Sequence, residues 1–210
     1  MIPARWERAL DASTSLASRS YADRLARAVS LACAPPVMIL PVAGLASWYG
    51  APGESPLVGI ITLVVTTALL PTLFVYAAYL AGLISSPDLP RRSERLQPAL
   101  FTTLCAVVAY PLLRGVGAPP LFLSLDAALA AQMALLALVT FWWKISYHAA
   151  GAAGLAVVAL ALGDLSISGP LFALAGLVGW ARVRLGRHTP RQVAAGWLSA
   201  LPILWYVWPI

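Results

Sequence analysis

Long uncharged stretches alternate with short polar ones along this chain. Asp, Glu, Lys and Arg are absent from residues 28–53 and 55–87. Five shorter charge-free runs follow, at 96–113, 127–143, 145–163, 165–181 and 192–210. A membrane-spanning helix needs roughly 20 mostly apolar residues, with about 17 as a lower limit. The pattern therefore predicts an all-α polytopic membrane bundle of six or seven transmembrane helices over residues 28–210.

Residues 1–27 differ from the rest because charged and apolar residues alternate there at helical spacing. Apolar residues recur at Trp6, Leu10, Ala17, Tyr21 and Leu25, and arginines take other positions. This pattern predicts an N-terminal interfacial helix that lies on the membrane surface. The charged region is too long, and contains too many acids, for a signal peptide. Three prolines in the following span, at positions 35, 36 and 41, predict a kinked or re-entrant first helix.

Composition agrees with a membrane protein. Hydrophobic residues make up 60% of the chain, and charged residues only 10%, so a soluble globule of this length is excluded. The net charge of +6 does not indicate a nucleic-acid partner, since no soluble basic domain carries it. Cys33 and Cys105 fall inside predicted spans and are interpreted as small buried hydrophobic residues. Nothing in the sequence indicates an oligomeric state.

Three polar clusters separate the predicted spans, at residues 87–95, 144–148 and 182–192. Two predicted spans lie between the first and second clusters, and two more between the second and third. An even number of crossings returns the chain to the same side of a membrane. We therefore expect all three clusters to meet on one face, and one missed or extra span would separate them.

The same face should carry the N-termini of three helices. Pro98 suits the first turn of one, and another begins near His148. Thr189-Pro190-Arg191-Gln192 predicts an N-cap, a first-turn proline and a capping-box glutamine. Unpaired N–H groups at such ends favour anions, phosphate in particular. Basic side chains of the clusters would add to a cationic pocket: Arg92, Arg95, Lys144 and Arg182.

His148 and His188 are the only histidines in the chain, and both belong to these clusters. Two imidazoles in an anion pocket suit phosphoryl transfer without metal or other cofactor, because one can attack phosphorus while the other protonates the leaving oxygen. A metal site is disfavoured by the shortage of ligands. A Ser-His-Asp hydrolase is disfavoured because Ser146 has no acidic third member nearby.

These residues resemble motifs of the type 2 phosphatidic acid phosphatase superfamily, which includes lipid phosphate phosphatases and vanadium haloperoxidases. Ile145-Ser146-Tyr147-His148 resembles that family's Pro-Ser-Gly-His motif. Arg182, five residues and then His188 match its Ser-Arg-x5-His motif, with Ala181 in place of serine. Arg91–Pro98 is similar to a variant of its first motif, Lys-x6-Arg-Pro. The resemblance covers about residues 88–200.

The resemblance implies a lipid phosphatase that acts through a phosphohistidine. His188 would be the nucleophile and His148 the general acid. Arg182 would bind phosphate, and Arg95 would take the place of the first-motif arginine. Ser146 would add hydrogen bonds to phosphate, and Arg92 would stand in for the first-motif lysine. Lys144 joins the phosphate-binding set on position alone.

Gln192 is the main departure from the family pattern. The family has an acidic residue there, four positions after the nucleophile, which holds the histidine ring. An amide oxygen can still accept a hydrogen bond from Nδ1, but it stabilises an imidazolium less well. Besides hydrolysis of an isoprenyl or glycerolipid phosphate or diphosphate, two alternatives therefore remain open: a lipid phosphotransferase, and a non-catalytic lipid-phosphate binder or transporter.

Charge distribution bears on which face of the cell membrane carries the site. Five arginines precede the first span, at positions 5, 8, 19, 24 and 27, whereas Arg114 is alone on the opposite side. The positive-inside rule then favours a cytoplasmic site in a multi-pass protein. The resemblance argues the other way, because many family members act on the outer face.

Overall fold

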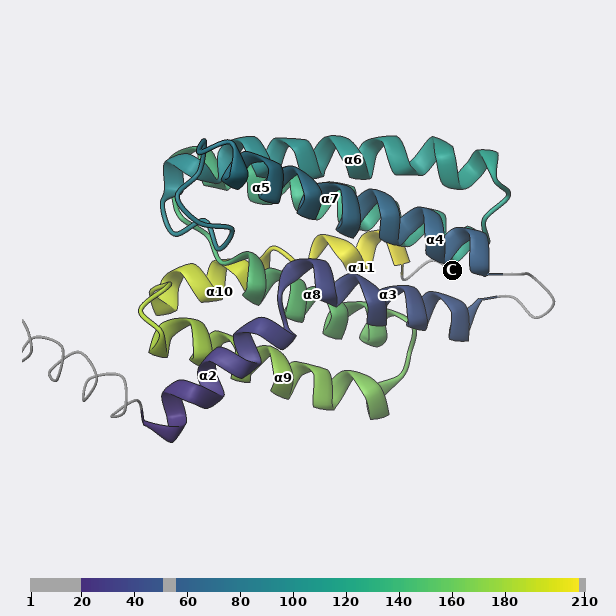
Figure 1. Cartoon of the computed structure of the whole chain (residues 1–210). Coiled ribbons are helices and arrows are strands. Elements are labelled where there is room, and N and C mark those ends of the chain that lie inside the picture. Colours follow the sequence, from purple (N-terminus) through teal and green to yellow (C-terminus); the bar gives the residue numbers. More distant parts are fainter. Residues whose placement is uncertain (1–19, 51–55, 208–210) are drawn as a thin grey trace, which may run out of the picture.

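The computed structural model describes residues 20–50 and 56–207, and this part of the chain contains helices and no strands (Figure 1). The helices are α2 (Tyr21–Ala32), α3 (Pro35–Tyr49), α4 (Leu57–Val64), a π-helical turn (Val65–Leu69), α5 (Leu70–Leu80), a 3-10 turn (Arg92–Glu94), α6 (Leu96–Gly115), α7 (Pro120–Trp142), α8 (Tyr147–Ala161), α9 (Leu165–Arg184), α10 (Pro190–Leu198) and α11 (Pro202–Val207).

Four of these helical segments are long and apolar enough to cross a membrane: 57–80, 92–115, 120–142 and 165–184. A fifth is added if the bent pair of α2 and α3 forms one span. The predicted all-helical membrane architecture is confirmed at this level. α8 has 15 residues, α10 has nine and α11 has six, so these three are shorter than a full span.

The first predicted span is bent, as its prolines indicated. α2 and α3 meet at 57° across residues 33–34. The break stands directly before Pro35, which has no N–H to continue a helix but fits a first turn. α2 also runs across the expected boundary between residues 27 and 28. Most of the expected interfacial helix, residues 1–19, lies outside the described residues.

α8 forms the centre of the bundle, and α3, α9, α10 and α11 all pack against it. Ten of its 15 residues are buried. Alanine and glycine dominate its sequence, which allows neighbouring backbones to approach closely. One close approach is at Gly196 of α10, where a Cβ atom would lie 2.6 Å from the carbonyl oxygen of Ser146, the N-cap of α8.

The three polar clusters lie together at one end of the bundle. In Figure 1 the C-terminal ends of α5, α7 and α9 and the N-terminal ends of α6, α8 and α10 share the left side. Hydrogen bonds and ion pairs join all three clusters. Their predicted meeting is thus confirmed as a fact of the fold. The end of α11 lies on the opposite side of the bundle.

Candidate active site

A cavity of about 1290 Å³ opens at the polar end of the bundle. Four of the eight side chains predicted for the site line it: His148, His188, Arg95 and Arg182. The other four are not among the lining residues: Arg92, Lys144, Ser146 and Gln192. Ser30 and Arg27 of α2 and Arg187 also line it, and sequence analysis gave none of the three a role.

His188 reaches the cavity through a tight turn after α9. Gly186 has φ of +64°, a left-handed conformation that suits glycine and ends the helix. The chain then folds back, so that the N–H groups of Arg187 and His188 both donate to the Arg182 carbonyl oxygen, at 3.0 and 3.2 Å. This turn places His188 next to Arg182, and His188 is only 6% exposed.

Gln192 determines which nitrogen of His188 carries the proton. The predicted capping box at the start of α10 is confirmed: Gln192 N–H donates to Thr189 Oγ1, and Thr189 N–H donates to Gln192 Oε1 at 3.1 Å. His188 Nδ1 lies 3.2 Å from the same Oε1. Because that oxygen can only accept, Nδ1 must be the donor. Nε2 therefore keeps its lone pair.

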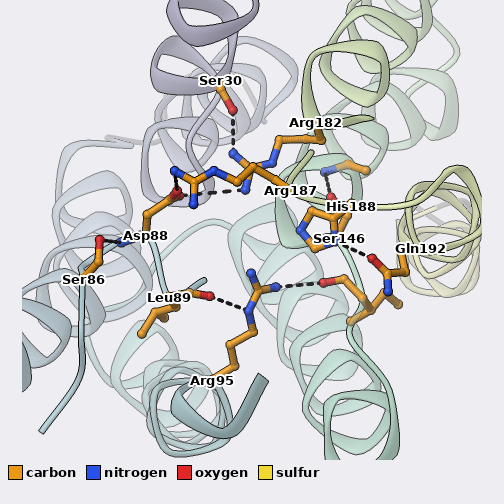
Figure 2. A network of polar contacts seen from close by, with 12 residues as sticks. Ser30, Ser86, Asp88, Leu89, Arg95, Ser146, Arg182, Arg187, His188 and Gln192 are labelled. Atoms are coloured by element: carbon orange, nitrogen blue, oxygen red, sulfur yellow. Dashed lines mark hydrogen bonds and ion pairs between the residues drawn. The ribbon is translucent and has the colours of Figure 1, made fainter. Parts of the chain in front are cut away.

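The two buried arginines are held by different elements (Figure 2). Arg182 Nη1 donates to Ser30 Oγ at 2.7 Å, which joins α9 to α2. Arg95 Nε donates to the Leu89 carbonyl oxygen at 2.7 Å, and its Nη1 to that of Ile145 at 3.2 Å. Within the described part of the chain, no acceptor is bonded to Arg95 Nη2. Both guanidinium groups are thus fixed in place while retaining donors for a ligand.

Asp88 is the acidic residue that pairs with Arg182 and Arg187 in the site. Its carboxylate lies 3.8 Å from Arg182 Nη2 and 3.0 Å from Arg187 Nη2. In Figure 2 dashed lines join it to both arginines. A carboxylate there marks a position that favours negative charge, since two guanidinium groups face it. Asp88 belongs to the polar cluster at 87–95, but the sequence does not indicate its arginine partners.

Two predicted phosphate ligands, Ser146 and Arg92, have other partners in the structure, and a third, Lys144, does not line the cavity. Ser146 is fully buried, and its hydroxyl accepts the Ala149 N–H as the N-cap of α8. Arg92 Nη1 donates to the carbonyl oxygens of Thr140 and Phe141 at the end of α7. For Lys144, burial and the positive charges of nearby arginines lower the pKa of its ammonium group.

His148 enters the cavity as the second residue of α8. Its position is set by the N-cap at Ser146 and by α10, since the Ser146 N–H donates to the Gln192 carbonyl oxygen at 3.3 Å. The residue before it, Tyr147, points its hydroxyl to Thr140 of α7 at 3.0 Å. One short connection thus ties His148 to the capping box that orients His188.

Comparisons with other proteins do not add to this geometry: no family model, no curated protein and no solved structure matches the chain. Among the described residues, no group of three or more His, Cys, Asp and Glu side chains is placed to hold a metal ion. Function must therefore be inferred from the histidines, the arginines and the cavity.

The electrostatics of His188 lead to a prediction. Burial, followed by the charges of Arg95, Arg182 and Lys144, lowers the pKa of His188 from 6.5 to about 3. We expect its ring to stay neutral down to about pH 4. An unfolded chain would take up this proton near pH 6.5, so His188 makes the folded state lose stability as the pH falls from about 6.5 towards 3.

A Gln192→Glu variant should raise the pKa of His188, because a carboxylate at this position favours the imidazolium and preserves the capping box. Titration of protein labelled with 15N-histidine would follow both rings, and a His148→Asn variant would assign them. Arg191→Gln, an exposed change one residue away, serves as the control. A wild-type His188 that titrates near pH 6.5 would contradict this account.

Proposed function

We propose that this protein is an integral-membrane, metal-independent phosphatase that hydrolyses a lipid phosphate or diphosphate through a phosphohistidine at His188. One observation carries the proposal: both histidines of the chain line one cavity with the buried guanidinium groups of Arg95 and Arg182. Neutral His188, with its Nε2 lone pair free, supplies a nucleophile at neutral pH.

The reaction would follow two steps. His188 Nε2 attacks phosphorus, the bond from phosphorus to the lipid oxygen breaks, and His148 donates a proton to that oxygen. Water then attacks phosphorus, His148 takes a proton from it, the bond from phosphorus to His188 Nε2 breaks, and inorganic phosphate leaves. A phosphate dianion next to His148 favours its protonated form before the first step. Arg95 and Arg182 would stabilise the charge on the equatorial oxygens.

Asp88 would have to give way to the substrate. Its carboxylate lies where Arg182 and Arg187 would otherwise face a phosphate. Because the Asp88 side chain is about one-third exposed, it can move into water when an anion with more charge enters. Product release would reverse this exchange.

A non-catalytic lipid-phosphate binder is the second candidate. The amide of Gln192, where a carboxylate would better stabilise an imidazolium, and the Asp88 ion pairs favour it. A phosphotransferase would share the first step with the hydrolase and differ only in the acceptor that enters second.

Phosphate release from a panel of lipid phosphates, in detergent and with a chelator present, tests the proposal. We expect turnover by the wild type and loss in both His188→Ala and His148→Ala, because one residue forms the bond to phosphorus and the other protonates the leaving oxygen. Equal background rates in all three proteins would instead support the binder. Phosphate transfer to an added lipid alcohol would identify the transferase.

We further propose seven crossings of the cell membrane with the site on the cytoplasmic face. The short helices α8 and α10–α11 would cross inside the protein, and the five N-terminal arginines would stay in the cytoplasm. Since α11 ends opposite the site, the C-terminus should then lie outside. Accessibility of a C-terminal tag in intact cells measures this, and a cytoplasmic tag would contradict the arrangement.

A further inference from the structure

The cavity extends far beyond the charged site, along one face of α8. His148, Gly151, Leu155 and Val158 line it in succession. Their spacing of three or four residues places them on the same face of the helix. Ten residues of helix rise about 15 Å, which is roughly one leaflet of a hydrocarbon core about 30 Å thick.

The deep walls of the cavity are apolar or already hydrogen-bonded. The hydroxyl groups of Thr67 and Thr102 donate to backbone carbonyl oxygens in their own helices, at 2.6 and 2.8 Å. The amide of Gln132 donates to the Ala150 carbonyl oxygen at 3.1 Å. No charged side chain lines the cavity as deep as Leu155 or Val158 among the described residues. Hydrocarbon suits these walls better than a polar ligand does.

A lateral opening lies between α5 and the bend of α2 and α3. Three lining residues there remain exposed: Leu31 at 75%, Val37 at 40% and Tyr76 at 53%. In the described part of the chain, α3 packs on α4 and on the π-helical turn, whereas its contact with α5 is at most marginal.

We propose that this cavity is a channel for an apolar chain of the phosphate-bearing lipid, and that Gly151 and Val158 limit the length of chain that fits. The inference rests on the proposed function for the identity of the head group. The chain would enter through the lateral opening while the phosphate stays at Arg95 and Arg182. Gly151 leaves the channel open close to the charged site, since a Cβ atom at this position would meet only Met38, at 3.7 Å.

The test uses n-alkylphosphonates from methyl to hexadecyl, whose carbon–phosphorus bond this reaction does not break. Binding to the full-length protein in one detergent is measured for the wild type, Gly151→Leu and Val158→Phe. Comparing variant with wild type at each length cancels partition into the detergent. Gly176→Leu, on an exposed face of α9 away from the cavity, is the matched control.

We expect each variant to weaken binding only above a certain alkyl chain length, and we expect that length to depend on where along the channel the substitution lies. Gly151→Leu should bind methylphosphonate like the wild type and octyl or longer chains at least about tenfold more weakly, the usual cost of overpacking. Val158→Phe, deeper in the channel, should weaken only the longest chains. Gly176→Leu should change none.

Unchanged binding of long chains in both variants, or equal weakening at every length, would overturn the channel. If Gly151→Leu does not fold, Val158→Phe alone must show a cut-off between octyl and hexadecyl. A position-dependent cut-off without any phosphate release would leave the channel standing and refute the phosphatase. Phosphate release without any cut-off would refute the channel and leave the phosphatase standing.

Discussion

His148→Ala should lose phosphate release from dodecyl phosphate by about a hundred- to ten-thousandfold, the usual contribution of a general acid. The same variant should lose far less of its first-turnover rate of nitrophenol release from 4-nitrophenyl phosphate, because 4-nitrophenolate leaves without a proton. His188→Ala should lose activity on both substrates, since it lacks the atom that binds phosphorus. Initial rates in detergent with a chelator measure all four values.

His148→Ala should also accumulate phosphoenzyme on 4-nitrophenyl phosphate, because the water that completes the second step has lost its base. A burst of one nitrophenol per site, followed by slow turnover, would show this intermediate. Tyr147→Phe is the neighbouring control: it removes the hydroxyl bonded to Thr140 and should stay close to the wild type. A first-turnover rate on 4-nitrophenyl phosphate that falls as far as phosphate release from dodecyl phosphate would argue against the role of His148 as the acid.

Features fixed by neighbouring residues could be predicted from the sequence. Charge-free runs located the helices, because a long apolar segment can satisfy its backbone in a membrane only as a helix. The capping box at Thr189 and Gln192 followed from their spacing alone. The meeting of the three polar clusters followed from counting helices between them.

Partners far apart in the sequence could not be predicted. Arg182 bonds Ser30 across 152 positions, and nothing in the sequence near Ser30 distinguishes it from other serines. That contact depends on how α2 packs on α9, which follows from the bend before Pro35. Asp88 likewise acquires its arginine partners only when the loop before α6 folds over the end of α9.

Polar residues with two plausible partners were the least predictable. Ser146 can cap a helix or bind a ligand, and in the structure its hydroxyl oxygen accepts a hydrogen bond from the Ala149 N–H. Arg92 can face the cavity or the end of α7, where carbonyl oxygens carry a partial negative charge. In both cases the nearer backbone partner holds the side chain, a preference that residue type and spacing alone do not reveal.

Arg182→Met should weaken binding of methylphosphonate by about ten- to a hundredfold, the range expected from losing hydrogen bonds to a charged group. Arg182 is 3% exposed, and methionine fills much of the same space without charge. Asp88 keeps Arg187 at 3.0 Å, so the variant leaves no carboxylate unpaired. Displacement of a labelled alkylphosphonate measures the affinity, and thermal unfolding reports the fold.

Ser30→Ala distinguishes direct binding of the anion by the Arg182 charge from a role of Arg182 in holding α2 against α9. It removes the hydrogen bond that joins α9 to α2 but keeps the Arg182 guanidinium in the cavity. If Arg182 binds the anion directly, Ser30→Ala should retain affinity within a few-fold while its unfolding temperature falls modestly, as expected for one lost hydrogen bond. Arg191→Met, an exposed arginine behind the site, should change neither. Equal loss of affinity in Ser30→Ala and Arg182→Met would mean that Arg182 acts by holding α2 in place, and that the anion is bound by Arg95 and Arg187 instead.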